Sequence, residues 1–214
     1  MSARTLDKVP LEPRHVLEAA RVSQETLRPA ADRDWSTQAG DLDWDCRRTL
    51  DHIVDAPMFY ATNLAMRSTQ RLPNVRAGAP QAPIAQIIDV LEYSAAILFR
   101  LAEATPPEAR GFHSAGMADA QGFVAMACDE ILIHTHDIAS GLGLAYQPPA
   151  ELCEAVLRRL FPWAEAGLDP WPGLLWANGR APLPGRDRQA ADWYWQCAPL
   201  SEWDGTVRKR KPAP

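Results

Sequence analysis

Apolar residues recur every three or four positions in four segments of the first 145 residues, which is the spacing of amphipathic helices. The pattern is clearest between Ile84 and Ala104, where the apolar stripe consists of Ile, Leu and Ala. Proline, glycine and short polar residues near the ends of the segments are typical start and stop signals. We predict helices over Glu12–Leu27, Asp45–Met66, Ile84–Ala104 and Asp119–Gly141.

Four helices of this length, with no convincing strand between them, predict an all-α fold. We expect an antiparallel four-helix bundle with some long loops, and we assign it to residues 1–145. Pro57 lies inside the second predicted helix. Its ring removes one backbone hydrogen bond and clashes with the Ile53 carbonyl, so a kink is expected one turn after His52.

The composition changes after residue 145. Residues 148–214 contain ten of the nineteen prolines and six of the eight tryptophans. A short helix is predicted over Glu151–Phe161, but the prolines that follow cannot sustain a long one. We therefore assign residues 146–207 to a C-terminal helix and an irregular wrap, whose tryptophans anchor it to the bundle or form a wall over a pocket. The basic run at 208–211 predicts a disordered tail over 208–214.

Charge and cysteine spacing disfavour several classes of function. The net charge of −5 argues against general nucleic-acid binding, because such binding depends on clustered Lys and Arg. No apolar run is long enough to span a membrane, and the first eight residues lack the apolar stretch of a secretory signal, so a cytoplasmic location is expected. The four cysteines are too scattered for a CxxC zinc or redox motif.

The main candidate for chemistry lies in the fourth predicted helix. Glu130 and His134 are four residues apart and share one helix face, whereas His136 lies about 200° around the helix from His134. A buried carboxylate beside a buried imidazole needs a further partner, and antiparallel packing could bring His52 opposite the pair. Two imidazoles and one carboxylate form a three-ligand site with an open position, as in catalytic zinc sites, and nickel, cobalt or iron also accept such ligands.

The residues alone leave two interpretations open. In the first, a divalent metal binds His52, Glu130 and His134, and Asp55 or Asp137 orients a ligand histidine. In the second, the Glu and the His of the fourth helix form a structural pair, and the histidine of the second helix is satisfied separately within the core. The spacing does not decide between them, because Glu-x-x-x-His pairs occur on many helices.

Two motifs carry a resemblance to a known family. Their residues are Trp44, His52, Glu130, His134 and Asp137, followed by Ile-Ala-Ser-Gly-Leu-Gly at 138–143. They resemble the DinB-like metalloprotein superfamily and, more narrowly, the mycothiol-dependent maleylpyruvate isomerase N-terminal domain family, over residues 10–145. The resemblance implies a four-helix bundle that holds a divalent metal, often zinc, on His52, Glu130 and His134.

The resemblance also implies a metal-dependent enzyme of the maleylpyruvate isomerase type. Coordination to the metal ionises a low-molecular-weight thiol such as mycothiol, which then attacks a small electrophile for S-transfer or isomerisation. An activated water would instead make the protein a hydrolase. The alternative to an enzyme is a non-catalytic bundle that binds a metal or a small molecule. In each case we expect a monomer or a homodimer.

Two further residues are assigned to the expected site, and two other histidines are given no role in it. Trp176 and Arg180 in the wrap are the candidates for substrate contact, since Arg suits a substrate carboxylate. His113 precedes the fourth helix and could reach the pocket, whereas His15 on the first helix is expected to be exposed.

Overall fold

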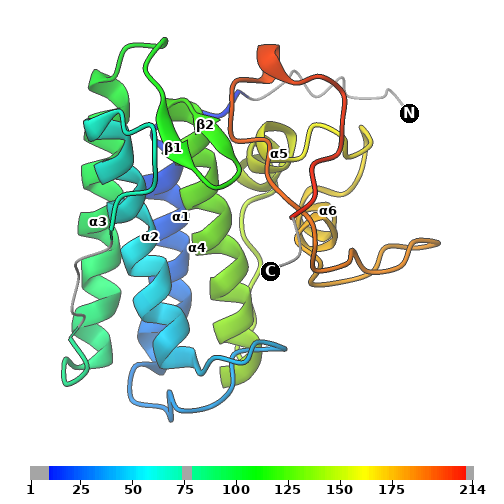
Figure 1. Cartoon of the computed structure of the whole chain (residues 1–214). Helices are drawn as coiled ribbons and strands as arrows, with labels where there is room; N and C mark the ends of the chain where they lie inside the picture. The colour runs from blue at the N-terminus through cyan, green and yellow to red at the C-terminus, as the bar shows by residue number, and fades with distance from the viewer. Residues whose placement is uncertain (1–9, 74–78, 211–214) are drawn as a thin grey trace.

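The structure, a computed structural model, describes residues 10–73 and 79–210. In this described part of the chain, four long helices lie side by side and form what we call the helical body (Figure 1). They are α1 (His15–Leu27), α2 (Cys46–Met66), α3 (Ile84–Ala104) and α4 (Ala120–Leu142). The fold is therefore mainly α, and the predicted bounds of the third helix are confirmed. None of the described helices combines the length and the apolar character needed to cross a membrane.

The core of the helical body lies where α1 and α2 each contact both α3 and α4. Leu50 and Ile53 on α2 and Leu91 and Leu98 on α3 are completely buried. Full burial of one such side chain contributes about 1.5–3 kcal/mol relative to leaving it in water. Packing in this shared core, more than helix propensity, therefore holds the helices in place.

Two aspartates and one glycine fix the ends of the helices that carry the candidate site. Asp45 accepts a hydrogen bond from the Arg48 backbone N–H at 2.7 Å, and Asp119 accepts one from the Gly122 backbone N–H at 2.8 Å. Both residues are N-caps just outside α2 and α4, which begin one residue later than predicted. The left-handed residue that ends α4 is Gly143, with a φ of 64°.

Gly141, the predicted end of α4, lies inside that helix. A Cβ atom at this position would overlap the carbonyl oxygen of Gln38. The glycine thus allows the loop before α2 to pack closely against α4, and this loop carries Trp44 to the candidate site.

α1 differs from the prediction in its start and in the burial of its first residue. The helix begins at His15 and not at Glu12. His15 is only 4% exposed, and its Nδ1 accepts a hydrogen bond from the Glu12 backbone N–H at 2.9 Å. The expectation of an exposed His15 was therefore wrong, because the ring turns back onto the segment that precedes the helix. Burial lowers the pKa of His15.

A short β-hairpin, which the sequence did not predict, covers one end of α2 and α4 (Figure 1). Strand β1 (Gly111–His113) pairs antiparallel with β2 (Gly116–Ala118), with Phe112 opposite Met117. Each strand has three residues, which is too short for a recognisable alternation of apolar and polar positions. The hairpin is tied to the end of α2 because the Phe112 backbone N–H donates to the Ser68 carbonyl at 2.7 Å.

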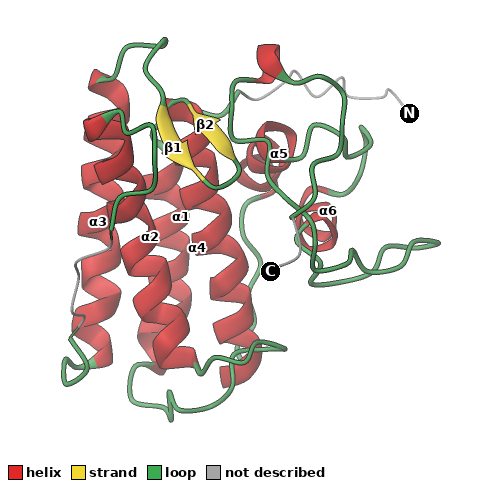
Figure 2. Ribbon diagram, in the orientation of Figure 1, coloured by secondary structure: helices red, strands yellow, loops and turns green. Residues whose placement is uncertain are grey.

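The segment after residue 145 lies beside α4 and contains two short helices, α5 (Ala150–Leu160) and α6 (Pro170–Ala177), joined by loops (Figure 2). α5 matches the predicted fifth helix to within one residue. α6 was not predicted, but its prolines at positions 170 and 172 lie in the first turn, where their missing N–H groups are not needed. We call residues 146–210 the C-terminal segment.

Residues 208–210 correct the prediction of a disordered basic tail. Lys209 forms an ion pair with Asp192 at 2.8 Å, and the backbone N–H of Arg210 donates to the Asp192 carbonyl at 2.7 Å. Arg208 donates to the carbonyl of Ala115 in the hairpin at 3.1 Å. These contacts hold the basic run against the rest of the C-terminal segment and the hairpin, and residues 211–214 lie outside the described part.

Candidate metal centre

The three predicted ligands come from α2 and α4, which pack against each other. α4 places Glu130 and His134 one turn apart, and α2 places His52 opposite them. Glu130 Oε2 lies 3.0 Å from His52 Nε2 and 3.1 Å from His134 Nε2. The side chain of His52 is 34% exposed, and those of Glu130 and His134 are each 13% exposed. The structure therefore brings the predicted residues together at a partly accessible place, and we call them the triad.

The spacing of the triad fits a metal ion. One ligand atom from each of the three side chains lies within 4.8 Å of the others, so the group could hold a metal ion. In a tetrahedral zinc site with bonds of about 2.0–2.2 Å, neighbouring ligand atoms lie roughly 3.3 Å apart. The two Nε2–Oε2 distances of 3.0 and 3.1 Å are close to that spacing. They are also ordinary hydrogen-bond distances, so they fit a structural Glu–His cluster as well.

Asp137 orients His134 through its other ring nitrogen. Its Oδ2 lies 2.9 Å from His134 Nδ1, and Arg180 Nη2 lies 2.9 Å from the same oxygen. A carboxylate on Nδ1 leaves Nε2 as the nitrogen that faces Glu130 and can bind a metal. Burial opposes a charge on the ring, but the hydrogen bonds with Asp137 and Glu130 outweigh it and raise the pKa of His134 to about 9.

Tyr60 holds the second oxygen of Glu130. Its phenol is 3% exposed and donates a hydrogen bond to Glu130 Oε1 at 3.2 Å. Burial disfavours a charge on the carboxyl, but the hydrogen bonds from His134 and His52 outweigh burial and hold the pKa of Glu130 well below its usual range. Glu130 is therefore an anion, as a metal ligand must be. Tyr60 was not predicted from the sequence, although its place about two turns beyond His52 on α2 is a usable signal.

Trp44 packs against both histidines of the triad. Its ring centre lies 5.2 Å from that of His52, edge to face, and 6.2 Å from that of His134, nearly parallel. The guanidinium of Arg48 lies 4.6 Å from the centre of the Trp44 ring. These contacts restrict the orientation of both imidazoles.

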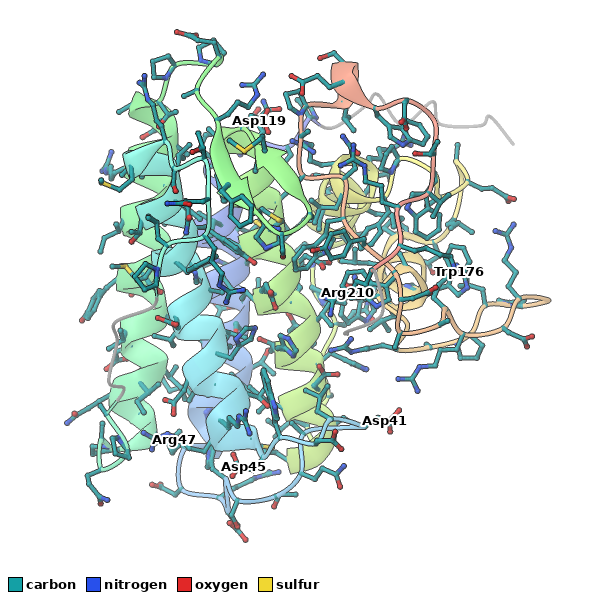
Figure 3. The ribbon with its side chains drawn as sticks, viewed as in Figure 1. Asp41, Asp45, Arg47, Asp119, Trp176 and Arg210 are labelled. Carbon is teal, nitrogen blue, oxygen red and sulfur yellow. The ribbon has the colours of Figure 1, made fainter. Side chains whose placement is uncertain are left out.

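A cavity of about 390 Å³, which we call the wrap cavity, lies between the triad and the C-terminal segment. Arg210 reaches it from the basic run, with its guanidinium 5.2 Å from the ring centre of Trp193. Figure 3 shows Arg210 between α4 and α6. The cavity is lined by Trp44, His52, Asp129, Glu130, Ile133, His134, Asn178, Arg180, Ala191, Trp193, Trp195 and Arg210.

Of the two substrate-contact candidates, the structure brings only Arg180 to the triad. Arg180 lines the wrap cavity while it holds Asp137. Trp176 is 7% exposed, and its indole N–H donates to the Asp187 carbonyl at 3.0 Å. Figure 3 shows Trp176 farther from α4 than Arg210 is. Trp176 therefore does not line the wrap cavity, because α6 turns its ring into the packing of the C-terminal segment.

A second cavity, of about 230 Å³, lies on the side of the β-hairpin, and we call it the hairpin cavity. His52 and Glu130 line this cavity as well as the wrap cavity. Asp55, the other carboxylate expected to orient a ligand, lines the hairpin cavity, whereas Asp137 contacts a triad histidine. The remaining lining residues are Ala56, Phe59, Tyr60, Arg71, Phe112, His113 and Ser114.

His113 reaches the pocket region through the hairpin. Its Nδ1 accepts a hydrogen bond from the Ala115 backbone N–H at 3.1 Å, and its ring lies against those of Tyr60 and Trp195. Burial lowers the pKa of His113 to about 4. The ring is therefore neutral at pH 7, and its proton is on Nε2.

Asp129, next to Glu130 in the chain, ties the C-terminal segment to α4. It is 1% exposed and accepts hydrogen bonds from Asn178 Nδ2 and Trp195 Nε1, each at 2.9 Å. Burial raises the pKa of Asp129 to about 7 in spite of these hydrogen bonds. Asp129 was not predicted from the sequence, because its hydrogen-bond donors lie 49 and 66 positions away. An acidic residue beside Glu130 in an otherwise apolar run was the available signal.

Two other residues of α4, His136 and Cys128, lie away from the triad. His136 packs its ring edge to face on Trp171, with centres 5.7 Å apart. Cys128 is completely buried, and burial raises the pKa of its thiol well above the usual value. All four cysteines are free and buried, as expected for reduced thiols. No family model, no curated protein and no solved structure matches the chain.

Proposed function

We propose that this chain is a metal-dependent enzyme whose triad binds a divalent ion, with zinc as the first candidate and nickel, cobalt or iron as the others. The observation that carries the proposal is the convergence of two imidazoles and one carboxylate within 4.8 Å, beside a cavity of about 390 Å³. Three protein ligands with a free side are typical of catalytic sites, whereas structural zinc sites use four. Asp137 behind His134 is the kind of support that metal-binding histidines have.

We further propose that α1–α4 form an antiparallel four-helix bundle of the DinB-like type, related to the maleylpyruvate isomerase N-terminal domains. The support is positional. The single histidine lies on α2 and the Glu-x3-His pair lies on α4, which is the arrangement that the resemblance implies. Trp44, which belongs to the same sequence pattern, contacts both histidines.

A divalent ion at the triad would supply Lewis acidity and would lower the pKa of a thiol or water molecule in its open position. The protein's own residues position the reactants. Asp137 and Tyr60 hold His134 and Glu130 in orientation, while Arg180 and Arg210 place positive charge along the wrap cavity. This charge suits a small anionic electrophile, such as a carboxylate, and a mycothiol-like low-molecular-weight thiol is the proposed co-substrate.

A non-catalytic interpretation also has an observation in its favour. Glu130 already receives hydrogen bonds from His52, His134 and Tyr60, so its charge is satisfied without a metal. In that case the triad would be a structural polar cluster beside a small-molecule pocket. Metal content separates this interpretation from the enzyme.

The test measures metal per chain by elemental analysis after expression with added zinc and removal of loose metal. The wild type and His136→Ala are expected to retain about one ion per chain, and His52→Ala and Glu130→Gln to lose nearly all of it. His136→Ala is the matched control because it removes an imidazole from the same helix, away from the triad. A folded wild type without metal, or a His52→Ala variant with full metal content, would overturn the proposal.

A second measurement separates a thiol-dependent enzyme from a hydrolase. Metal-loaded protein is incubated with a panel of small carboxylate-bearing electrophiles, with and without a thiol. Turnover that requires the thiol supports S-transfer or isomerisation, and equal turnover without it supports hydrolysis.

A further inference from the structure

Two separate cavities meet at the triad. The wrap cavity and the hairpin cavity share His52 and Glu130 as lining residues, and the other residues of the two cavities differ. Residues of the C-terminal segment line one cavity, and residues of the hairpin and of the middle of α2 line the other. The His52–Glu130 edge can therefore be approached from two sides, which suits a reaction between two molecules.

The charges of the two cavities differ. Apart from the triad residues, the wrap cavity has two arginines, Arg180 and Arg210, and one carboxyl group, that of Asp129. The hairpin cavity has one cation, Arg71, and one carboxylate, Asp55. The wrap cavity is therefore the more positive of the two, and an anion is favoured there over the hairpin cavity.

The hairpin cavity offers hydrogen bonds without excess charge. His113 presents its Nε2 proton, because Nδ1 is already an acceptor for the Ala115 backbone N–H. Ser114 contributes a hydroxyl, and Phe59 and Phe112 contribute apolar surface. Such walls suit an uncharged polar molecule.

We propose that the hairpin cavity binds the thiol co-substrate in its uncharged form, while the anionic electrophile occupies the wrap cavity. This inference rests on the proposed function, because it assigns the two reactants of that reaction to two sides of the triad. The cavity volume of about 230 Å³ equals roughly seven to eight water volumes, enough for the thiol-bearing end of a larger molecule. A thiol is neutral as it enters and loses its proton to solvent only on reaching the metal position, so the carboxylates of this cavity do not repel it.

The test uses Co²⁺-loaded protein and two probes, 2-mercaptoethanol and benzoate. Binding of the thiol is followed by the sulfur-to-cobalt charge-transfer absorption, and binding of benzoate by the shift of the cobalt d–d bands. Ala56→Leu and Ser114→Phe narrow the hairpin cavity, and Ala191→Phe narrows the wrap cavity. Ser114 and Ala191 are exposed, so Ser114→Phe and Ala191→Phe should fold normally. These two variants compare the two cavities even if Ala56→Leu, at a buried position, does not fold.

The expected result is a crossover between the two probes. Ala56→Leu and Ser114→Phe weaken thiol binding about tenfold or more and leave benzoate within about threefold, and Ala191→Phe does the reverse, because each filled cavity excludes its own ligand. Loss of thiol binding in Ala191→Phe with no loss in the hairpin variants would overturn the assignment. So would thiol binding that is insensitive to all three changes, or cobalt-loaded protein without a charge-transfer band. Absence of bound cobalt would instead overturn the proposed metal function, and the inference with it.

Discussion

Asp137 is the residue through which the metal hypothesis can be tested without touching a ligand. Its Oδ2 lies 2.9 Å from His134 Nδ1 and 2.9 Å from Arg180 Nη2, and the residue is 3% exposed. Asp137→Asn preserves the shape but removes the charge, and its NH₂ group replaces Oδ1, which in the wild type accepts a hydrogen bond from Arg180 Nε at 3.3 Å. We expect the zinc affinity to fall about 10–100-fold, which corresponds to about 1.4–2.7 kcal/mol.

The assay is competition for Zn²⁺ against a chromophoric chelator at constant pH, with circular dichroism to verify that each variant is folded. Asp51→Asn is the control. It removes the same unit of charge next to His52, but from a carboxylate that is 44% exposed and pairs with Arg47. We expect this control to stay within about threefold of the wild type, since solvent screens exposed charges.

Comparing Asp137→Asn with Asp51→Asn separates the orientation of His134 by Asp137 from a general effect of negative charge near the triad. If Asp137→Asn and Asp51→Asn weaken zinc binding equally, the effect is a general loss of negative charge and the orienting role of Asp137 is refuted. If Asp137→Asn binds zinc as tightly as the wild type, the hydrogen bond to His134 has no part in metal binding. Arg180→Gln should give a smaller loss than Asp137→Asn, because it leaves the carboxylate on His134 in place.

Three further changes test other parts of the structure. His15→Asn should reduce the loss of stability in acid. Burial lowers the pKa of His15 in the folded state below 6.5, so the unfolded chain takes up the proton first and the free energy of unfolding falls as the pH drops below 6.5. Denaturant midpoints of the wild type and the variant, measured at a series of pH values above and below 6.5, test this. Gly122→Ala should destabilise the fold by about 1–3 kcal/mol, because its Cβ would overlap the Cys197 carbonyl. Thermal melting measures this loss, and Gln121→Ala at the exposed neighbouring position should leave the melting temperature nearly unchanged. Thr135→Val should cost about 1–3 kcal/mol by leaving Ser23 without its buried partner at 2.5 Å, and adding Ser23→Ala should recover part of the loss in urea unfolding.

Periodicity predicted the long helices because their pattern extends over several turns. α3 has the bounds Ile84–Ala104 in both prediction and structure, and Asp119 caps α4 as expected. The hairpin and α6 were missed for a common physical reason. Strands of three residues and a helix of eight, with prolines in its first turn, depend on tertiary contacts for their conformation and leave little periodic signal.

Residues of the candidate site were predictable only where two of them lie on the same helix or belong to the same sequence motif. Glu130 and His134 follow from helix spacing, and His52 was expected opposite them. Tyr60, Asp129 and the hairpin cavity could not be assigned in the same way, because their contacts join segments far apart in the chain. Arg210 is the clearest case: a run of basic residues predicts a solvated tail, yet pairing with residues 192–194 brings this side chain to the wrap cavity.

α4 links the triad to the C-terminal segment through two carboxylates. At about 100° per residue, Asp129 and Asp137 lie on the same side of the ligand pair around the helix, and both bind groups of the C-terminal segment. Asp129 holds Asn178 and Trp195, and Asp137 holds Arg180, so the walls of the wrap cavity are attached to the helix that carries Glu130 and His134. We therefore expect changes elsewhere in the C-terminal segment to alter which ligand binds in the wrap cavity while the triad keeps its geometry. The residues concerned are Ala191, Trp193 and Arg210. Under the proposed function, substrate choice and metal binding would be separable in this architecture, and substrate choice would depend on the part of the sequence with the least regular pattern.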